Sequence, residues 1–233
     1  MHTTNRDLRI DLLRTLAILL MVIYHAAYDL VTYHGWNMDI FQGGWLILAR
    51  ASLILFLLVS GMSQALSHRA KGPAIRWKRF AQVAAAAVLV SVATYAMDPE
   101  TYVRFGVLHL IAVSALLLPF FARLKMWNAL IGFLILAIAM LMPSASPEVF
   151  GTSAVPMIVL GFPPVHFQTV DYVPLIPWFG VVLIGYACGY LWKSKQSDQS
   201  ALFQNLTWPG RHSLLIYLLH QPVLFAVLFV LHP

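Results

Sequence analysis

The chain has 233 residues, of which 60% are hydrophobic and only 10% charged, and its formal net charge is +6. With a mean hydropathy of +0.76, this balance excludes a water-soluble domain and predicts an all-α, polytopic helix bundle in a membrane. The basic residues fall at the ends of apolar runs, which argues against nucleic acid as a partner. We expect residues 1–233 to form one integral-membrane domain.

Seven apolar runs come close to the roughly 20 residues that a helix needs to cross a bilayer. They cover residues 10–31, 44–66, 80–97, 105–122, 127–142, 174–192 and 212–231. The longest connection, 143–173, contains a further apolar piece at 155–162 that is too short to span. We expect this piece to be re-entrant or interfacial.

Lys and Arg are concentrated in alternate loops. One side carries Arg6, Arg9, Arg69, Lys71, Arg76, Lys78, Arg79, Arg123, Lys125, Lys193, Lys195 and Arg211, while the loops of the other side carry Asp39, Asp98, Glu100, Glu148 and Asp171 with Arg104. The positive-inside rule then places the N-terminus in the cytoplasm and the C-terminus outside.

Four ionisable residues share one face of the first predicted helix: Asp11, Arg14, His25 and Asp29. At about 100° per residue they fall within about 60° of one another, and Arg14 and His25 lie about 16 Å apart along the axis. Charged residues are kept in a bilayer where they face a bundle interior or a water-filled cavity. The structural alternatives are a local Asp11–Arg14 ion pair and a hydrogen-bonded core histidine at position 25.

Further polar residues lie toward the predicted outer side. Arg50 is the cation in the outer half of the second span, and His109 lies about one turn inside the fourth. Asp171 and Trp178 lead the long loop into the sixth span. Each has a structural alternative: Arg50 could snorkel to the interface, and His109 could be a hydrogen-bonded core histidine. Asp171 could cap a helix, and Trp178 could belong to an aromatic belt.

The last predicted helix carries a polar face. Ser213, Tyr217 and His220 fall within about 60° of one another, which predicts a polar seam toward the first helix. Hydrogen bonding between helices is the structural alternative for this seam.

Several stretches together resemble the heparan-α-glucosaminide N-acetyltransferase catalytic-domain family, in its short bacterial form. They are residues 9–14, 21–25, 60–63, 106–111, 171–180 and 210–220, and they occur in family order. The ten-residue gap between Arg14 and His25 is also similar to the wider membrane acyltransferase-3 superfamily, where this pair is implicated in acyl transfer.

The resemblance implies transfer of an acetyl group from cytosolic acetyl-CoA to an amino sugar across a bacterial inner membrane, with no metal. Membrane lipids, acyl-CoA and a carbohydrate acceptor are the expected partners, and a homo-oligomer is left open. In the animal enzymes a histidine just after the first helix, on the outer side, is implicated in catalysis. His34 is its counterpart here, so the catalytic role is open between His25, which we prefer, and His34.

These inferences combine into a membrane acyltransferase. His25, oriented by Asp29, would be the general base, and Arg50 or His109 would stabilise the oxyanion. The residues expected to bind acyl-CoA or the acceptor are Asp11, Arg14, Arg50, Arg76, Lys78, Arg79, Asp171, Trp178, Arg211, His212, Ser213, Tyr217 and His220. The alternative is a proton-coupled transporter or channel that uses the same stripe.

The charge pattern gives a direct test of topology. We expect seven spans with the N-terminus in the cytoplasm and the C-terminus outside, because Lys and Arg avoid translocated loops. A C-terminal reporter that is active only outside the cytoplasm should be active on this chain. Activity of a C-terminal reporter that works only in the cytoplasm would refute the orientation.

Overall fold

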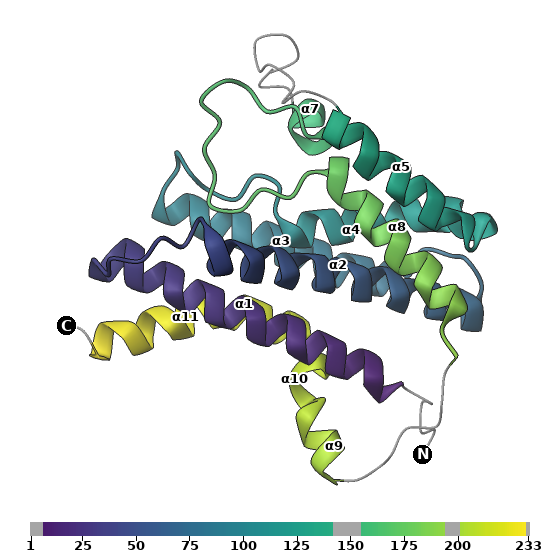
Figure 1. Ribbon diagram of the computed structural model, residues 1–233, viewed down its shortest axis with the longest axis horizontal. Coiled ribbons are helices and arrows are strands. Elements are labelled where there is room, and N and C mark those ends of the chain that lie inside the picture. Colours follow the sequence, from purple (N-terminus) through teal and green to yellow (C-terminus); the bar gives the residue numbers. More distant parts are fainter. Residues whose placement is uncertain (1–6, 142–154, 194–200, 232–233) are drawn as a thin grey trace. The chain divides into compact units, whose positions relative to one another are not determined.

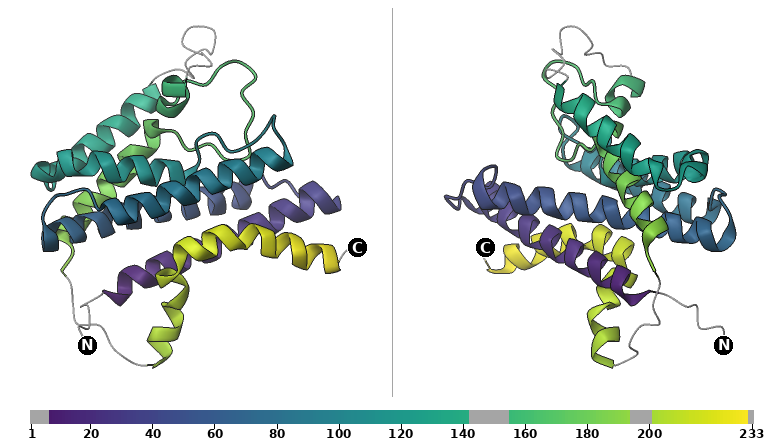
Figure 2. Two further views of the ribbon diagram at one scale, coloured as in Figure 1. Left: turned by 180° about the vertical axis from the view of Figure 1, so that it is seen from behind. Right: turned by 45° about the vertical axis from the view of Figure 1, so that its right-hand side comes forward.

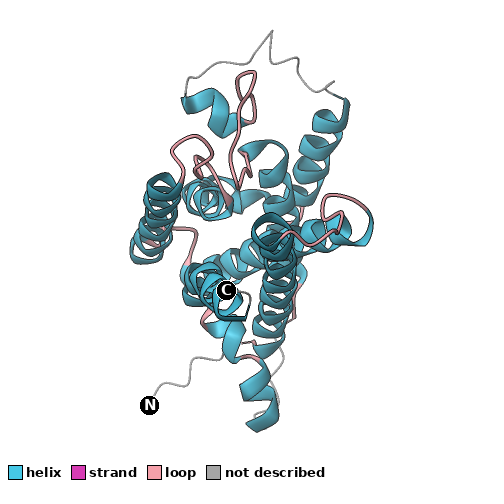
Figure 3. Ribbon diagram, turned by 90° about the vertical axis from the view of Figure 1, so that its left-hand side faces the viewer, coloured by secondary structure: helices cyan, strands magenta, loops and turns pink. Residues whose placement is uncertain are grey.

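The structure is a computed structural model, and it describes residues 7–141, 155–193 and 201–231. These residues are mainly helical, and none of them forms a strand (Figures 1 and 3). Arg6, Glu148, Lys195 and the segment 143–154 of the long connection lie outside the described residues.

Each predicted apolar run forms a helix. The helices are α1 (Leu8–His34), α2 (Gly43–Lys71), α3 (Trp77–Met97), α4 (Val107–Phe121), α5 (Trp127–Leu141), α8 (Leu175–Leu191) and α11 (Ser213–Leu231). Within the described part of the chain, five segments are long and apolar enough to cross a membrane: α1, α2, α3, α11, and α4 extended to Leu124. Since α5 and α8 have 15 and 17 residues, the seven-span count stays a prediction, as does the orientation.

Four short helical segments complete the described chain. They are the 3-10 turn η1 (Ala122–Leu124), α7 (Val155–Leu160), α9 (Ala201–Leu206) and α10 (Trp208–Arg211). The six-residue α7 lies within the piece expected to be too short to span. The last predicted run, 212–231, is helical from Ser213, because the backbone leaves the helical region at His212 and separates α10 from α11.

The helices group into two compact units, with α2 contributing to both. One unit comprises residues 1–59 and 193–233, and the other comprises residues 60–192. We describe each unit by itself, and the single-domain expectation stays a prediction.

The first unit is built around α1. Asp7 caps its start by accepting the Arg9 backbone N–H at 3.1 Å, and Gly35 ends it in the left-handed region at φ 70°. Helix α11 runs beside α1, and α9 and α10 pack on its first turns (Figures 1 and 2). At this junction the Thr15 hydroxyl accepts the Gly210 N–H at 3.0 Å and lies 3.0 Å from the Leu206 carbonyl oxygen.

The second unit is centred on α8, whose side chains Val182, Leu183 and Tyr186 are fully buried. Glycines let its neighbours approach closely. A Cβ at Gly132 of α5 would lie 2.5 Å from the Gly180 carbonyl oxygen of α8, and a Cβ at Gly180 would lie 2.7 Å from the Gly132 carbonyl oxygen. Such glycine contacts let helix backbones pack closely in membranes.

The Gly132–Gly180 contact predicts a stability loss. We expect Gly132→Ala to lower the free energy of unfolding by about 1–3 kcal/mol, because the added methyl group must separate α5 from α8. Gly44→Ala is the matched control, since its Cβ would meet nothing within 4 Å. Thermal unfolding of the purified protein in detergent measures both, and an equal effect of the two changes would contradict the prediction.

Candidate active site

Helix α1 has two chemically different faces. Leu12, Leu16, Leu19 and Ile23 are exposed and lie within about 60° of one another, so they form a lipid-compatible stripe. The four ionisable residues lie on the other side of the helix. Their two carboxylates are fully buried or nearly so, at 1% exposure for Asp11 and 0% for Asp29, which confirms that this face points into the protein.

At the predicted cytoplasmic end, α10 covers this face. Asp11 and Arg14 form an ion pair, as the structural alternative predicted. Gly210 packs directly on the Asp11 carbonyl, where a Cβ would clash. Arg211 therefore lies at the same end of the unit as the Arg14 guanidinium, whose side chain is 21% exposed.

Toward the other end, two histidines from α1 and α11 meet. The centroids of the His25 and His220 rings lie 4.8 Å apart with the planes at 78°, and the Tyr217 ring is 5.6 Å from His220. The polar seam toward the first helix is thus confirmed for His220. Ser213, the third member of the seam, is half-buried at the first residue of α11.

Backbone carbonyls fix the tautomers of both rings. His25 Nδ1 lies 2.9 Å from the Met21 carbonyl oxygen, and His220 Nδ1 lies 2.6 Å from that of Tyr217. Since a carbonyl only accepts, each neutral ring carries its proton on Nδ1 and its lone pair on Nε2. The Nε2 atom of His220 is buried and has no hydrogen-bond partner among the described residues.

The expected orientation of His25 by Asp29 is wrong. Asp29 Oδ1 instead accepts a hydrogen bond of 2.7 Å from the Gln221 side-chain amide. Asp29 Oδ2 and Gln221 Oε1 are buried without a hydrogen-bond partner in the part of the chain that is described. A buried acceptor without a donor is costly, so this end of the unit is suited to a ligand or a proton that supplies one.

The second histidine candidate lies elsewhere on α1. The resemblance implied a histidine just after the first helix. His34 is instead the last residue of α1, because the helix continues to the Gly35 cap. Nine residues after His25, it falls about 180° around the helix and about 13 Å further along. The two histidines therefore cannot serve one site from the same face.

In the second unit, His109 and Asp171 both stabilise the start of α4. His109 Nδ1 accepts the Gly106 N–H at 3.2 Å, and its Nε2 lies 3.2 Å from the Ser91 hydroxyl. Asp171 accepts the Val107 N–H at 3.1 Å. It therefore caps α4 and not the helix that it precedes in sequence.

The remaining predicted binding residues are spread over both units. Arg76 donates to the Ser67 and Gly72 carbonyls at 3.3 and 3.2 Å, which caps the end of α2. His212 stacks on Trp208 with its ring centroid at 4.5 Å. Lys78, Arg79 and Arg50 are exposed, and Trp178 is half-buried in α8.

Sequence reasoning missed Thr15 and Gln221 as site residues. Thr15 lies one turn after Asp11, about 40° around the helix, so the same periodicity could have placed it on the stripe. Gln221 follows His220 at the edge of the predicted seam and is a further polar residue in a mainly apolar helix. A polar residue in such a segment is a signal that the seam is wider than three residues.

Together the fold and the site define a helical membrane protein with buried titratable groups between its first and last long helices. A family model described as heparan-alpha-glucosaminide N-acetyltransferase, catalytic, matches residues 6–222. The chain belongs to this family, which confirms the resemblance. No match was found among curated proteins or among solved structures.

The buried carboxyl of Asp171 predicts a pH dependence of stability. Burial raises its pKa to about 6 from 3.8, although the Val107 N–H donates to it. Between about pH 4 and pH 6 the folded protein keeps a proton that the unfolded chain releases, so the free energy of unfolding should fall as the pH rises. We expect Asp171→Asn to flatten this part of the profile of unfolding midpoint against pH.

Asp98→Asn is the matched control. Asp98 lies in the α3–α4 loop, and the Thr101 hydroxyl, followed by the Glu100 N–H, lowers the pKa of its carboxyl. Its contribution to stability is therefore lost as the pH falls, the opposite sign. An unchanged slope in Asp171→Asn would show that the carboxyl does not titrate as described.

Proposed function

We propose that this protein is a membrane-embedded acetyltransferase that moves an acetyl group from cytosolic acetyl-CoA to a sugar or amino-sugar acceptor. Membership of the family supports the reaction class. The observation that carries the assignment is His25, whose Nδ1 is held by the Met21 carbonyl so that Nε2 presents a lone pair. Its neighbour His220 has the same arrangement.

The donor would enter at the end of the unit that holds Arg14 and Arg211. Arg side chains bind phosphate well because their planar N–H groups match its oxygens. The ion pair with Asp11 holds the Arg14 guanidinium in place while leaving part of it exposed. From there the pantetheine arm would follow α1 over the roughly 16 Å that separate Arg14 from His25.

In the chemical step, the amine or hydroxyl of the acceptor attacks the thioester carbonyl carbon. His25 Nε2 takes the proton that the attacking group loses, as a general base. The C–S bond then breaks, and the proton returns to the departing CoA thiolate. Arg50 is proposed to stabilise the oxyanion, because it is the cation in the predicted outer half of α2.

A proton-coupled transporter or channel is the second candidate. The buried Asp29 and the paired histidines favour it, because proton pathways use such groups. Binding or hydrolysis of acetyl-CoA by the purified protein separates the two functions. Only the acetyltransferase needs the thioester, whereas only the transporter would move protons in its absence.

The His25 assignment predicts a split between binding and catalysis. We expect His25→Ala to lower the rate of acetyl transfer or acetyl-CoA hydrolysis by about 10²–10⁴-fold, because a general base contributes that much. Affinity for CoA should change little, since the ring lies far along α1 from the proposed phosphate site. Fixed-time assays of product formation measure the rate, and calorimetric titration with CoA measures the affinity.

Three further variants control this experiment. Arg14→Ala should weaken CoA binding, and Arg14→Lys should weaken it less, because the charge remains while the planar fork is lost. His34→Ala should keep full activity, since His34 lies on the opposite face of α1. Loss of activity in His34→Ala with full activity in His25→Ala would move the chemistry to His34.

A further inference from the structure

The second unit contains a pocket that the proposed reaction does not use. It has a volume of about 450 Å³ and is formed by the α3–α4 loop, α7 and the segment that follows α7. This volume falls within the range of about 300–1,000 Å³ typical of small-ligand sites. Its lining combines one cation, Arg104, with a histidine, His166, and otherwise apolar and aromatic side chains.

Arg104 is held in place by rings and carbonyls. Its guanidinium carbon lies 4.9 Å from the centroid of the Tyr102 ring and 5.0 Å from that of Phe167. It also donates to the Glu100 carbonyl at 3.2 Å. None of the described carboxylates forms an ion pair with it, so its charge is available to an anion.

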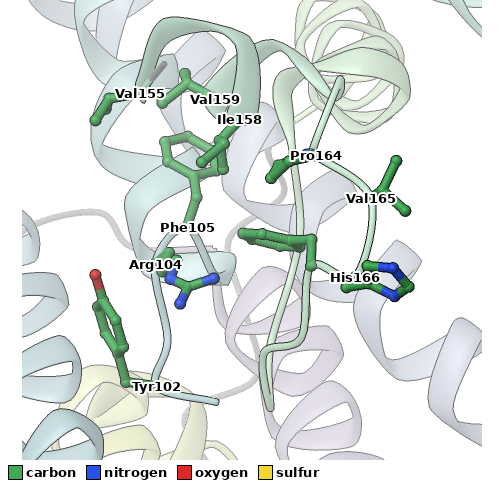
Figure 4. Close-up of a pocket in the computed structure, with 10 residues that line it drawn as sticks. Tyr102, Arg104, Phe105, Val155, Ile158, Val159, Pro164, Val165 and His166 are labelled. Atoms are coloured by element: carbon green, nitrogen blue, oxygen red, sulfur yellow. The ribbon is translucent and has the colours of Figure 1, made fainter. Parts of the chain in front are cut away.

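The opposite wall of the pocket is apolar. Figure 4 shows Val155, Ile158 and Val159 of α7 gathered on one side, with the Phe105 ring between them and Arg104. Apolar lining residues also reach the surface, since Val155 is 70% exposed and Val165 is 48% exposed. A short helix with exposed apolar side chains is suited to the bilayer interface, where lipid covers such groups.

These two walls restrict the chemistry of the occupant. A free sugar would leave the α7 side chains against polar groups, and a plain hydrocarbon would leave the guanidinium without an anion. We propose that the pocket binds a bilayer lipid that carries a phosphate, with the phosphate on Arg104 and the first part of its aliphatic chain against α7. Guanidinium–phosphate contacts are strong because they are charge-assisted.

This lipid can be a diacyl phospholipid or a polyprenyl phosphate, and a titration distinguishes them. The full-length protein in detergent would be titrated with phosphatidylglycerol, polyprenyl phosphate and phosphatidylcholine, with binding followed by native mass spectrometry. At least one of the two anionic lipids should bind about tenfold more tightly than phosphatidylcholine, as expected for a charge-assisted contact. The lipid that binds identifies the source, and equal binding of all three would overturn the proposal.

Variants assign the contact to the pocket. Arg104→Gln should weaken binding of the anionic lipid about tenfold, and Arg104→Lys should weaken it less. Arg123→Gln is the matched control, because this exposed cation of η1 does not line the pocket. Unchanged binding of the anionic lipid in Arg104→Gln would overturn the proposal.

A fourth variant tests the apolar wall without changing Arg104, so the proposal does not depend on the folding of the Arg104 variants alone. Ile158→Trp should fill the pocket from its apolar side and lower lipid binding while Arg104 remains in place. Undiminished binding in this variant would refute the α7 contact. The inference does not depend on acetyl transfer, because the pocket belongs to residues 60–192 and the proposed base to the other unit.

Discussion

The hydrogen bond from Gln221 to Asp29 joins the first and the last long helices of the chain at 2.7 Å. A carboxyl with no exposed surface on an apolar helix requires such a partner, because lipid offers none. At the other end of the same face, Gly210 lies against the Asp11 carbonyl. The polar face of α1 is thus covered at both ends by the C-terminal part of the chain, which brings His220 beside His25.

Three of the six stretches that carry the family resemblance are packing elements. In the second unit Gly61 lies against the Val182 carbonyl, Gly106 against the Asp171 carboxylate, and Gly180 against Gly132. A side chain at these positions would force helices apart or disturb the cap of α4. The stretches 60–63, 106–111 and 171–180 therefore serve helix packing in this chain, while the proposed chemistry rests on 9–14, 21–25 and 217–220.

Apolar run lengths were sufficient to predict where the seven long helices form, and periodicity was sufficient to predict which face of α1 is buried. The short helices α9 and α10 lie outside the predicted runs. Neither run length nor periodicity could predict partners that are distant in sequence. Asp171 caps a helix that begins 64 residues earlier, and Asp29 bonds to Gln221, not to His25. His25 Nδ1 was already satisfied by the Met21 carbonyl one turn away. Some observed helix ends also differ from the predicted ones, because a single residue ends the helix. Gly35 ends α1, so His34 lies within the helix and not after it.

The paired histidines match the proton requirement of the proposed reaction. Each neutral ring offers an acceptor at Nε2, so neither can donate to the other until a proton enters from a substrate. Once one ring is protonated, repulsion between two imidazolium rings whose centroids are 4.8 Å apart opposes a second proton. The pair is therefore suited to hold a single proton, and acyl transfer needs one, taken from the acceptor and returned to the CoA thiolate. A transporter would in addition need a continuous path to both sides. On the buried face of α1, the residues between Arg14 and His25 are Thr15, Ala17, Ile18 and Met21, so this face offers no titratable group over that distance.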